Sequence, residues 1–150
     1  MRSWQAIYRS HFPDGYLDNL SVEQRAATWR RILTDPSQMI AVYELPSGIV
    51  GFACIGPSRD ADATLKTGEL SSIYLDPNVW RQGIGTLLIR WAMAAAVSRS
   101  WDKMTLWVLK VNAQARTFYE QSGWLADGVT KSEPFGGGTM EEMRYEWCAA

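Results

Sequence analysis

Residues 68–88, GELSSIYLDPNVWRQGIGTLL, decide the fold of this chain. The apolar run from Glu69 to Leu75 predicts a β-strand, which Asp76-Pro77 ends. Gly83 and Gly85 follow, and after them apolar residues recur at helical spacing. A strand that leads through such a turn into a helix and then into another strand is a right-handed βαβ unit, so its two strands are expected to be parallel.

The flanking segments add antiparallel neighbours to this unit. A capped helix is expected from Ser21 to Pro36, after which the patterning becomes that of strands. The remaining expected elements are strands over 39–44, 49–55, 69–75 and 104–109, helices after Gly83 and over 112–122, and final strands over 124–130 and 140–147. The sequence therefore predicts one α/β domain over residues 1–150, with a mixed, mostly antiparallel central sheet and helices on both faces.

Length, composition and charge exclude several kinds of protein. The chain has 150 residues, and 47% apolar against 21% charged residues is the balance of a globular domain rather than a disordered chain. A net charge of -1 gives no field that would draw the chain to nucleic acid or an anionic membrane. No apolar run approaches the ~18–20 residues of a membrane span, and no signal peptide is recognisable. We therefore expect a cytoplasmic protein with neither nucleic-acid nor membrane partners.

The cysteine and histidine content argues against a metal site. Cys54 and Cys148 lie far apart and outside any metal-binding spacing, and His11 is the single histidine. We therefore expect no metal, no structural disulfide and a reducing compartment.

The turn Gly83-x-Gly85 has the features of an anion site. Backbone amides at a helix N-terminus lack intrahelical acceptors, and the helix dipole favours negative charge there. Two readings stay open at this point: a tight connection without a ligand, and a site for any carrier of a pyrophosphate. An NAD fingerprint is disfavoured because Leu88 stands where a third glycine is needed, and the P-loop lysine is absent.

A second group of residues lies on the later predicted helix. Asn112, Ala115 and Tyr119 share one side of it, because the seven positions from Asn112 to Tyr119 make close to two turns. Taken singly, these residues have ordinary structural explanations, Asn112 as an N-cap and Phe118 with Tyr119 as an aromatic core pair. Their combination with the glycine turn on the preceding unit favours a functional site.

The two motifs together resemble those of the GCN5-related N-acetyltransferases. The first, Gly68-Glu69-Leu70 … Ile73-Tyr74-Leu75-Asp76-Pro77 … Arg81-Gln82-Gly83-Ile84-Gly85 … Leu88, is similar to the acetyl-CoA motif of that family. The second, Asn112-x-x-Ala115-x-x-Phe118-Tyr119-Glu120-x-x-Gly123-Trp124, resembles the family's next motif. Order and separation both match, and the resemblance extends from Ala41 to Trp147.

The resemblance implies an acetyl-CoA site between two splayed parallel strands. The pantetheine arm would pair with the strand near Ile73–Leu75, the amides of Gln82 through Thr86 would take the pyrophosphate, and Asn112 would bind the pantetheine amides. The full set implied for the cosubstrate is Ile73, Tyr74, Leu75, Arg81, Gln82, Gly83, Ile84, Gly85, Thr86, Asn112, Ala115 and Tyr119.

The resemblance also implies direct transfer of an acetyl group to a primary amine. An alkylamine with a pKa of ~10.4 is mostly protonated at pH 7, so a general base is useful. Glu69 is the candidate base, acting directly or through a water molecule, because some family members carry a glutamate at that place. A glutamate at a strand start is, however, usually only solvated. Tyr119 is the candidate acid that protonates the departing thiolate. A backbone amide near Tyr74 would stabilise the oxyanion, unless a bulge changes the direction of that strand's amides.

Two features depart from the family pattern. Trp80 stands where the family usually has glutamine or arginine, so Arg81 or Gln82 would replace that polar contact. Met1–Tyr8 resembles the second half of the family's first helix, so the family's first strand is expected to have no counterpart in this sequence. A start codon placed too far downstream would explain this, and so would a sheet that is truly trimmed. In a trimmed sheet the strand over 39–44 would be an edge strand, which invites pairing with a second copy in a homodimer.

The acceptor is expected between the N-terminal helices and the loop that joins the last two strands. Aromatic walls with a carboxylate suit a cationic amine, and the candidates there are Tyr16, Trp29, Glu133 and Phe135. The expected acceptor is a small-molecule amine. The alternatives are a peptide or protein amine, and a non-catalytic sensor module that only binds acyl-CoA.

Overall fold

A computed structural model describes residues 21–135 and 137–150. Its helices are α2 (Val22–Thr34), α3 (Ile84–Ser98) and α4 (Ala113–Gln121), and a short 3-10 turn spans Pro77–Val79. Its strands are β1 (Met39–Leu45), β2 (Gly48–Pro57), β3 (Thr67–Leu75), β4 (Lys103–Leu109), β5 (Leu125–Phe135) and β6 (Gly138–Cys148). Within these described ranges, no helix combines the length and the apolar character needed to cross a bilayer.

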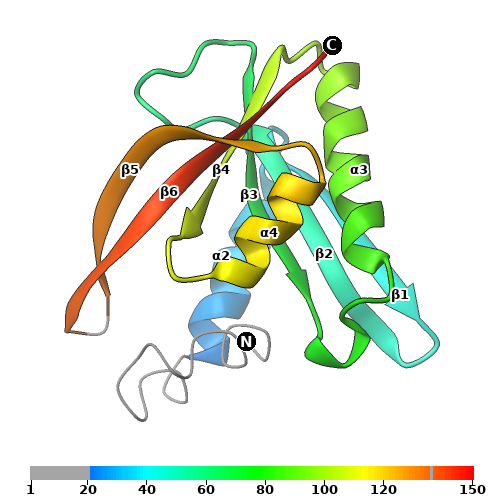
Figure 1. Cartoon of the computed structure of the whole chain (residues 1–150). Coiled ribbons are helices and arrows are strands. Elements are labelled where there is room, and N and C mark those ends of the chain that lie inside the picture. The colour runs from blue at the N-terminus through cyan, green and yellow to red at the C-terminus, as the bar shows by residue number, and fades with distance from the viewer. Residues whose placement is uncertain (1–20, 136) are drawn as a thin grey trace.

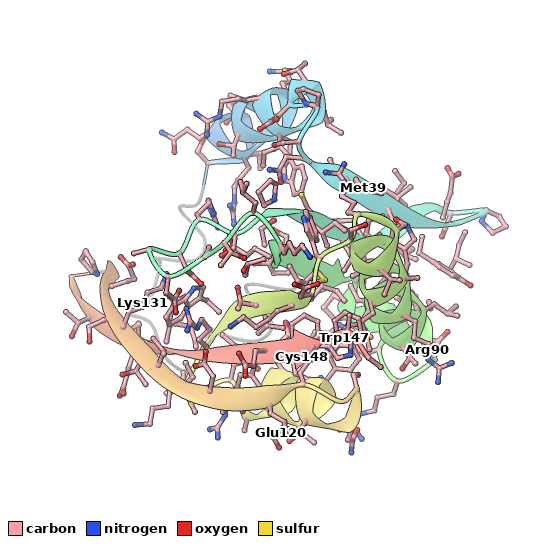
Figure 2. All side chains as sticks on the ribbon, turned by 90° about the horizontal axis from the view of Figure 1, so that it is seen from above. Met39, Arg90, Glu120, Lys131, Trp147 and Cys148 are labelled. Carbon is pink, nitrogen blue, oxygen red and sulfur yellow. The ribbon has the colours of Figure 1, made fainter. Side chains whose placement is uncertain are left out.

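The strands form one mixed sheet in the order β1-β2-β3-β4-β6-β5. β3 and β4 run parallel, and the other neighbouring strands of this sheet are antiparallel. Helix α2 lies on one face of the sheet, and α3 and α4 lie on the other (Figures 1 and 2). These observations confirm the fold class expected from the sequence. β1 stands at one end of the described sheet, and its pairing with a second copy stays a prediction.

Helix α2 begins at the expected cap but contributes little to the core. The Ser21 hydroxyl accepts a hydrogen bond of 3.1 Å from a first-turn amide, which is the usual N-cap interaction. The side chains of Val22 and Leu33 are largely exposed. The ring of Trp29 packs edge-on against Phe52 of β2, with 4.8 Å between the ring centroids. This contact therefore anchors the helix to the sheet.

The core lies between the sheet and α3. Apolar side chains from α3, β2, β3 and β4 fill it, and each is at most 5% exposed: Ile84, Leu88, Ile89, Ala92, Ala96, Ala53, Ile55, Leu70, Met104 and Leu106. Burying one of the larger aliphatic side chains stabilises the fold by about 1.5–3 kcal/mol. This layer therefore fixes α3 on the sheet, and with it the glycine turn that precedes the helix.

The last two strands form a longer hairpin than the sequence predicts. β5 continues to Phe135 and β6 begins at Gly138, so the glycine-rich segment expected as a loop is partly taken into the strands. The pairing between them shifts between Ala126 and Thr130, where Gly128 has a φ of 88°. Such a bulge bends a strand, and the hairpin curves away from the other strands in Figure 1.

β3 and β4 pair only at their N-terminal ends. The ladder begins at Thr67 with Lys103 and ends at Glu69 with Thr105. Just beyond it, Ser71 is an extra residue of β3 relative to β2, which makes a β-bulge. The expected splay of this parallel pair is therefore present, and the functional cavity lies beyond the last shared pair.

Candidate functional site

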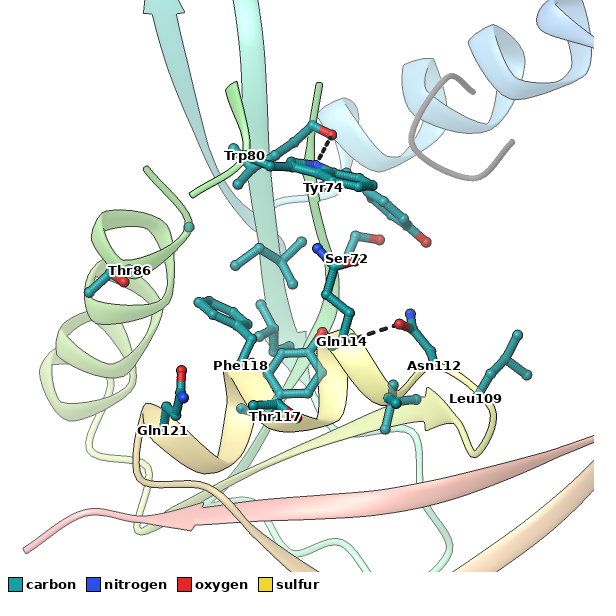
Figure 3. Close-up of a pocket in the computed structure, with 18 of the residues that line it drawn as sticks. Ser72, Tyr74, Trp80, Thr86, Leu109, Asn112, Gln114, Thr117, Phe118 and Gln121 are labelled. Atoms are coloured by element: carbon teal, nitrogen blue, oxygen red, sulfur yellow. Dashed lines mark hydrogen bonds between the residues drawn. The ribbon is translucent and has the colours of Figure 1, made fainter. Parts of the chain in front are cut away.

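A cavity of about 920 Å³ opens where β3 and β4 diverge. Both strands contribute walls to it, together with the start of α3 and one side of α4 (Figure 3). Around it the structure brings together most of the residues expected at the cosubstrate site: Ile73, Tyr74, Leu75, Arg81, Gly83, Gly85, Thr86, Asn112, Ala115 and Tyr119. Their part in binding stays a prediction, but they share one cavity.

The glycine turn presents open backbone donors at one end of the cavity. Gly83 is the N-cap of α3, has a φ of 83° and carries no side chain that could occupy the amides that follow it. The first-turn amides, which include those of Gly85 and Thr86, have no acceptor within the helix. Both residues line the cavity, and Thr86 lies on the α3 side of it in Figure 3. This arrangement can hold a phosphate-like anion.

Glycine is required at the two positions of the turn for different structural reasons. At Gly83 the backbone conformation is one that other residues adopt with strain, while a Cβ there would meet no atom within 4 Å. At Gly85 a Cβ would lie 3.3 Å from the Leu75 side chain and 3.3 Å from the Phe118 ring. Gly85 therefore lets α3 pack closely against β3 and α4.

The side chains of three residues around the turn are used for packing or for local hydrogen bonds. The Ile84 side chain belongs to the core, so only its amide is available to a ligand. Gln82 does not line the cavity, and its side-chain amide lies 3.4 Å from the carbonyl oxygen of Asn78, to which it donates. The indole of Trp80 donates to the carbonyl oxygen of Leu75 at 3.2 Å (Figure 3), so this residue holds the end of β3. Neither Gln82 nor Trp80 therefore places a free polar side chain on the turn.

Helix α4 supplies the opposite flank of the cavity. Asn112 is its N-cap, and the Oδ1 atom accepts the amide of Ala115 at 3.1 Å. Tyr119 is only 8% exposed, and its ring packs near the rings of Phe118, Trp124 and Tyr145. The aromatic packing fixes the position of the Tyr119 ring in the cavity wall.

Tyr145 supports Tyr119 from behind. Its hydroxyl donates to a carboxylate oxygen of Glu120 at 2.7 Å and accepts from the Nε atom of Arg116 at 3.3 Å. Burial is the main cause that raises the pKa of Tyr145 above its ordinary value. Tyr145 itself is outside the cavity lining, so its hydroxyl serves the packing of α4 on the sheet.

Glu69 lies in a different setting from the one expected of a general base. It lies at the last shared pair of β3 and β4, is 4% exposed and does not line the cavity. The Oε1 atom accepts from an Nη atom of Arg59 at 2.8 Å, and Oε2 accepts from the Nε atom of Arg59 at 3.0 Å. This hydrogen bonding raises the pKa of Arg59. With both oxygens held in this way, Glu69 anchors the loop before β3 to the strand. Its part as a general base stays a prediction.

Two of the four expected acceptor residues, Trp29 and Glu133, can be placed in the structure. Trp29 packs on Phe52, and the exposed side chain of Glu133 lies 3.7 Å from Lys131. Neither residue lines the cavity. Tyr16 and the side chain of Phe135 lie outside the described residues.

The wall that sequence reasoning missed comes from β4 and β6. Trp107 and Glu142 line the cavity from these strands. Behind them, the buried guanidinium of Arg144 donates to Asp60, Asp62 and Asp127 at 3.2, 2.8 and 2.6 Å. Hydrogen bonding to Asp62 is the largest cause that raises the pKa of Arg144. The alternation of polar side chains along β4 and β6 is the signal that could have located this wall.

In the ranges 21–135 and 137–150, no group of three or more histidine, cysteine, aspartate or glutamate side chains is arranged to hold a metal ion.

Sequence comparison places the chain among known proteins. The family described as Acetyltransferase (GNAT) family matches residues 1–124. An uncharacterized N-acetyltransferase of Bacillus subtilis (strain 168), YuaI, is 26% identical over 110 residues, which is 73% of this chain. The match spans 62% of that relative, so this chain covers less than two thirds of its length.

Two solved structures share the fold. The PaiA N-acetyltransferase of Thermoplasma acidophilum, solved with coenzyme A, has a TM-score of 0.72 at 19% identity, over 99% of this chain and 87% of that chain. The ribosomal-protein-alanine N-acetyltransferase of Brucella melitensis has a TM-score of 0.72 at 21% identity, over 96% of this chain and 91% of that chain. Because the family match covers most of the sequence, this chain belongs to the acetyltransferase (GNAT) family.

Proposed function

We propose that this protein transfers the acetyl group of acetyl-CoA directly to a primary amine of a small molecule. The observation that carries the proposal is the cavity between β3 and β4, with open helix-start amides at one end and Tyr119 in its wall. Family membership supports the same cosubstrate, and the PaiA structure that shares the fold was solved with coenzyme A.

The residues of the cavity suit the parts of coenzyme A. The first-turn amides of α3 are placed to take the pyrophosphate, and Arg81 lines the cavity beside them as a positive charge. The segment Ile73–Leu75 lies beyond the last β3–β4 pair, so its edge can pair with the amides of the pantetheine arm. A volume of about 920 Å³ also leaves room for an acceptor next to the thioester.

Acetyl-CoA supplies an activated acyl group as a thioester. The amine first loses its ammonium proton to water. Its nitrogen then forms a bond to the acyl carbon while the carbon–sulfur bond breaks, and the nitrogen releases its surplus proton to solvent, from which the Tyr119 oxygen regains one. The Tyr119 hydroxyl donates its proton to the departing sulfur, which makes this step easier than release of a bare thiolate. The packing around Tyr119 holds the hydroxyl in place for that transfer.

The test is Tyr119→Phe with Tyr145→Phe as the matched control. Both changes remove a hydroxyl from a buried tyrosine, but only Tyr119 lines the cavity. We expect Tyr119→Phe to lower kcat about tenfold or more while the Kd for acetyl-CoA stays within twofold. Tyr145→Phe should lower the melting temperature and leave kcat within twofold. Equal kcat for wild type and Tyr119→Phe would remove Tyr119 from the chemistry.

A protein amine is the second acceptor class to test. The ribosomal-protein-alanine N-acetyltransferase that shares the fold favours it by analogy. Release of coenzyme A from acetyl-CoA should be measured with a panel of small amines and with peptides that carry free α-amines. Turnover with peptides alone would replace the small-molecule acceptor. Tight binding of acetyl-CoA without turnover on any amine would instead favour a sensor module.

A further inference from the structure

An ammonium group of the protein itself lies against two residues of the cavity wall. The Nζ atom of Lys131, on β5, lies 4.2 Å from the centroid of the Trp107 ring. The same Nζ atom is 3.5 Å from an oxygen of Glu142 and 3.7 Å from an oxygen of Glu133. Trp107 and Glu142 line the cavity, so an aromatic face and a carboxylate together form a cation site at its edge.

The Trp107 ring is held in place independently of Lys131. Its indole Nε1 atom donates to Asp60 at 2.9 Å. The other carboxylate oxygen of Asp60 accepts from Arg144 at 3.2 Å, and Arg144 is 5% exposed. The ring therefore keeps its orientation when the ammonium over it leaves, which is the property of a preorganised binding site.

Lys131 is bound weakly enough to be displaced. Its side chain is 39% exposed, and the Glu142 and Glu133 side chains are 19% and 48% exposed. Ion pairs of this exposure contribute at most about 1 kcal/mol, and an exposed cation–π contact contributes about 0.5–1 kcal/mol. A long lysine side chain can move its charged end into water at little further cost.

We infer that the Trp107–Glu142 site binds an ammonium group of the acceptor, and that Lys131 occupies it in the free protein. The inference rests on the proposed function and names its substrate class. A carboxylate and an aromatic face both stabilise the charged form of an amine, so the group bound there keeps its proton and does not attack. The attacking nitrogen is then a second amino group of the same molecule. The acceptor is a diamine or a longer polyamine.

Direct binding tests this inference without using turnover. Unbranched α,ω-diaminoalkanes of three to six carbons would be titrated calorimetrically into the protein, and compared with amino alcohols of the same length. We expect at least one diamine to bind about fivefold more tightly than its amino alcohol. Glu142→Gln should abolish that preference, and Lys131→Met should strengthen diamine binding about threefold because the competing ammonium is gone.

Lys110→Met is the matched control. Lys110 also pairs with a glutamate of β6, Glu141, at 3.1 Å, but neither residue lines the cavity. Its replacement should leave diamine binding unchanged. The inference is wrong if no diamine binds better than its amino alcohol, or if Lys131→Met and Lys110→Met behave alike. Affinity for acetyl-CoA and turnover on monoamines are measured separately. A failure of the diamine site can therefore be distinguished from a failure of the proposed acetyltransferase activity.

Discussion

The two walls of the cavity are built in different ways. The wall formed by the start of α3 offers mainly backbone groups, the amides that follow Gly83. The wall formed by β4 and β6 offers side chains, Trp107 and Glu142, which stand on a buried network around Arg144. Under the proposed function, the first wall would bind coenzyme A, which is the same for every family member. The second wall would bind the acceptor amine, which differs between family members.

The difference also lies in how far apart the partners are in the sequence. The first wall is built within residues 68–88, where one strand, one turn and one helix follow directly. The Arg144 network joins residues 84 and 82 positions apart, since Arg144 reaches back to Asp60 and Asp62. The first wall therefore depends on local sequence, whereas the second depends on the packing of the loop after β2 against β6.

The largest effect that separates the two walls should come from Arg144→Met. Asp60 and Asp127 are mostly buried, with side chains 14% and 9% exposed, and they would lose their main cationic partner. Leaving buried carboxylates unpaired should lower the free energy of unfolding by about 3 kcal/mol. The measurement is urea denaturation at pH 7. The Kd for acetyl-CoA should stay within twofold, because the hydrogen bonds of Arg144 join β6 to β5 and to the loop after β2 rather than to α3.

Arg90→Met is the control for that experiment. Arg90 is an exposed residue of α3 (Figure 2), and its replacement should change the free energy of unfolding by less than about 0.5 kcal/mol. If Arg144→Met is as stable as Arg90→Met, the network does not support the second wall. If Arg144→Met reduces the free energy of acetyl-CoA binding by as much as it reduces the free energy of unfolding, the two walls are not independent.

The first wall was predictable because its signals are local. The glycines and the apolar spacing of α3 each indicate their own structure, and the turn forms where expected. The Asn112 cap of α4 is a local signal of the same kind, and it also forms where expected. The splay of β3 and β4 was implied by family resemblance. The need for glycine at position 85 could not be predicted from the sequence, because it depends on close packing against Phe118 of a later helix.

The second wall was not predictable in the same way. Glu69 has the residue type and position of a base, but only the folded loop shows that Arg59 holds both of its oxygens. Of the residues expected around the acceptor, Trp29 packs on Phe52, whereas Trp107, which was not among them, lines the cavity. The alternation of residues along a strand predicts which face of the sheet a side chain lies on. It does not predict which other side chain forms an ion pair with it.

The intermediate effect should come from Gly83→Ala, which tests the backbone wall. Gly83 has a φ of 83°, which costs other residues about 1–2 kcal/mol, so the turn should rearrange its amides. We expect the Kd for coenzyme A, measured by calorimetry, to rise about tenfold. Gly128→Ala is the matched control, because Gly128 has a φ of 88° and also has open space around a Cβ. If both variants lose affinity equally, strain alone explains the loss.

The smallest effect is expected from Glu69→Gln, which tests whether either wall uses this carboxylate in the reaction. Gln keeps one oxygen acceptor for Arg59 but loses the charge, so the free energy of unfolding should fall by about 1 kcal/mol. The value of kcat and its dependence on pH should stay within twofold of wild type, because Glu69 lies outside the cavity lining. Arg59→Met should give a similar loss of stability, since it removes the same pair from the other side. A tenfold fall in kcat for Glu69→Gln, together with unchanged kcat for Arg59→Met, would return Glu69 to the role of general base and require Arg59 to release it during turnover.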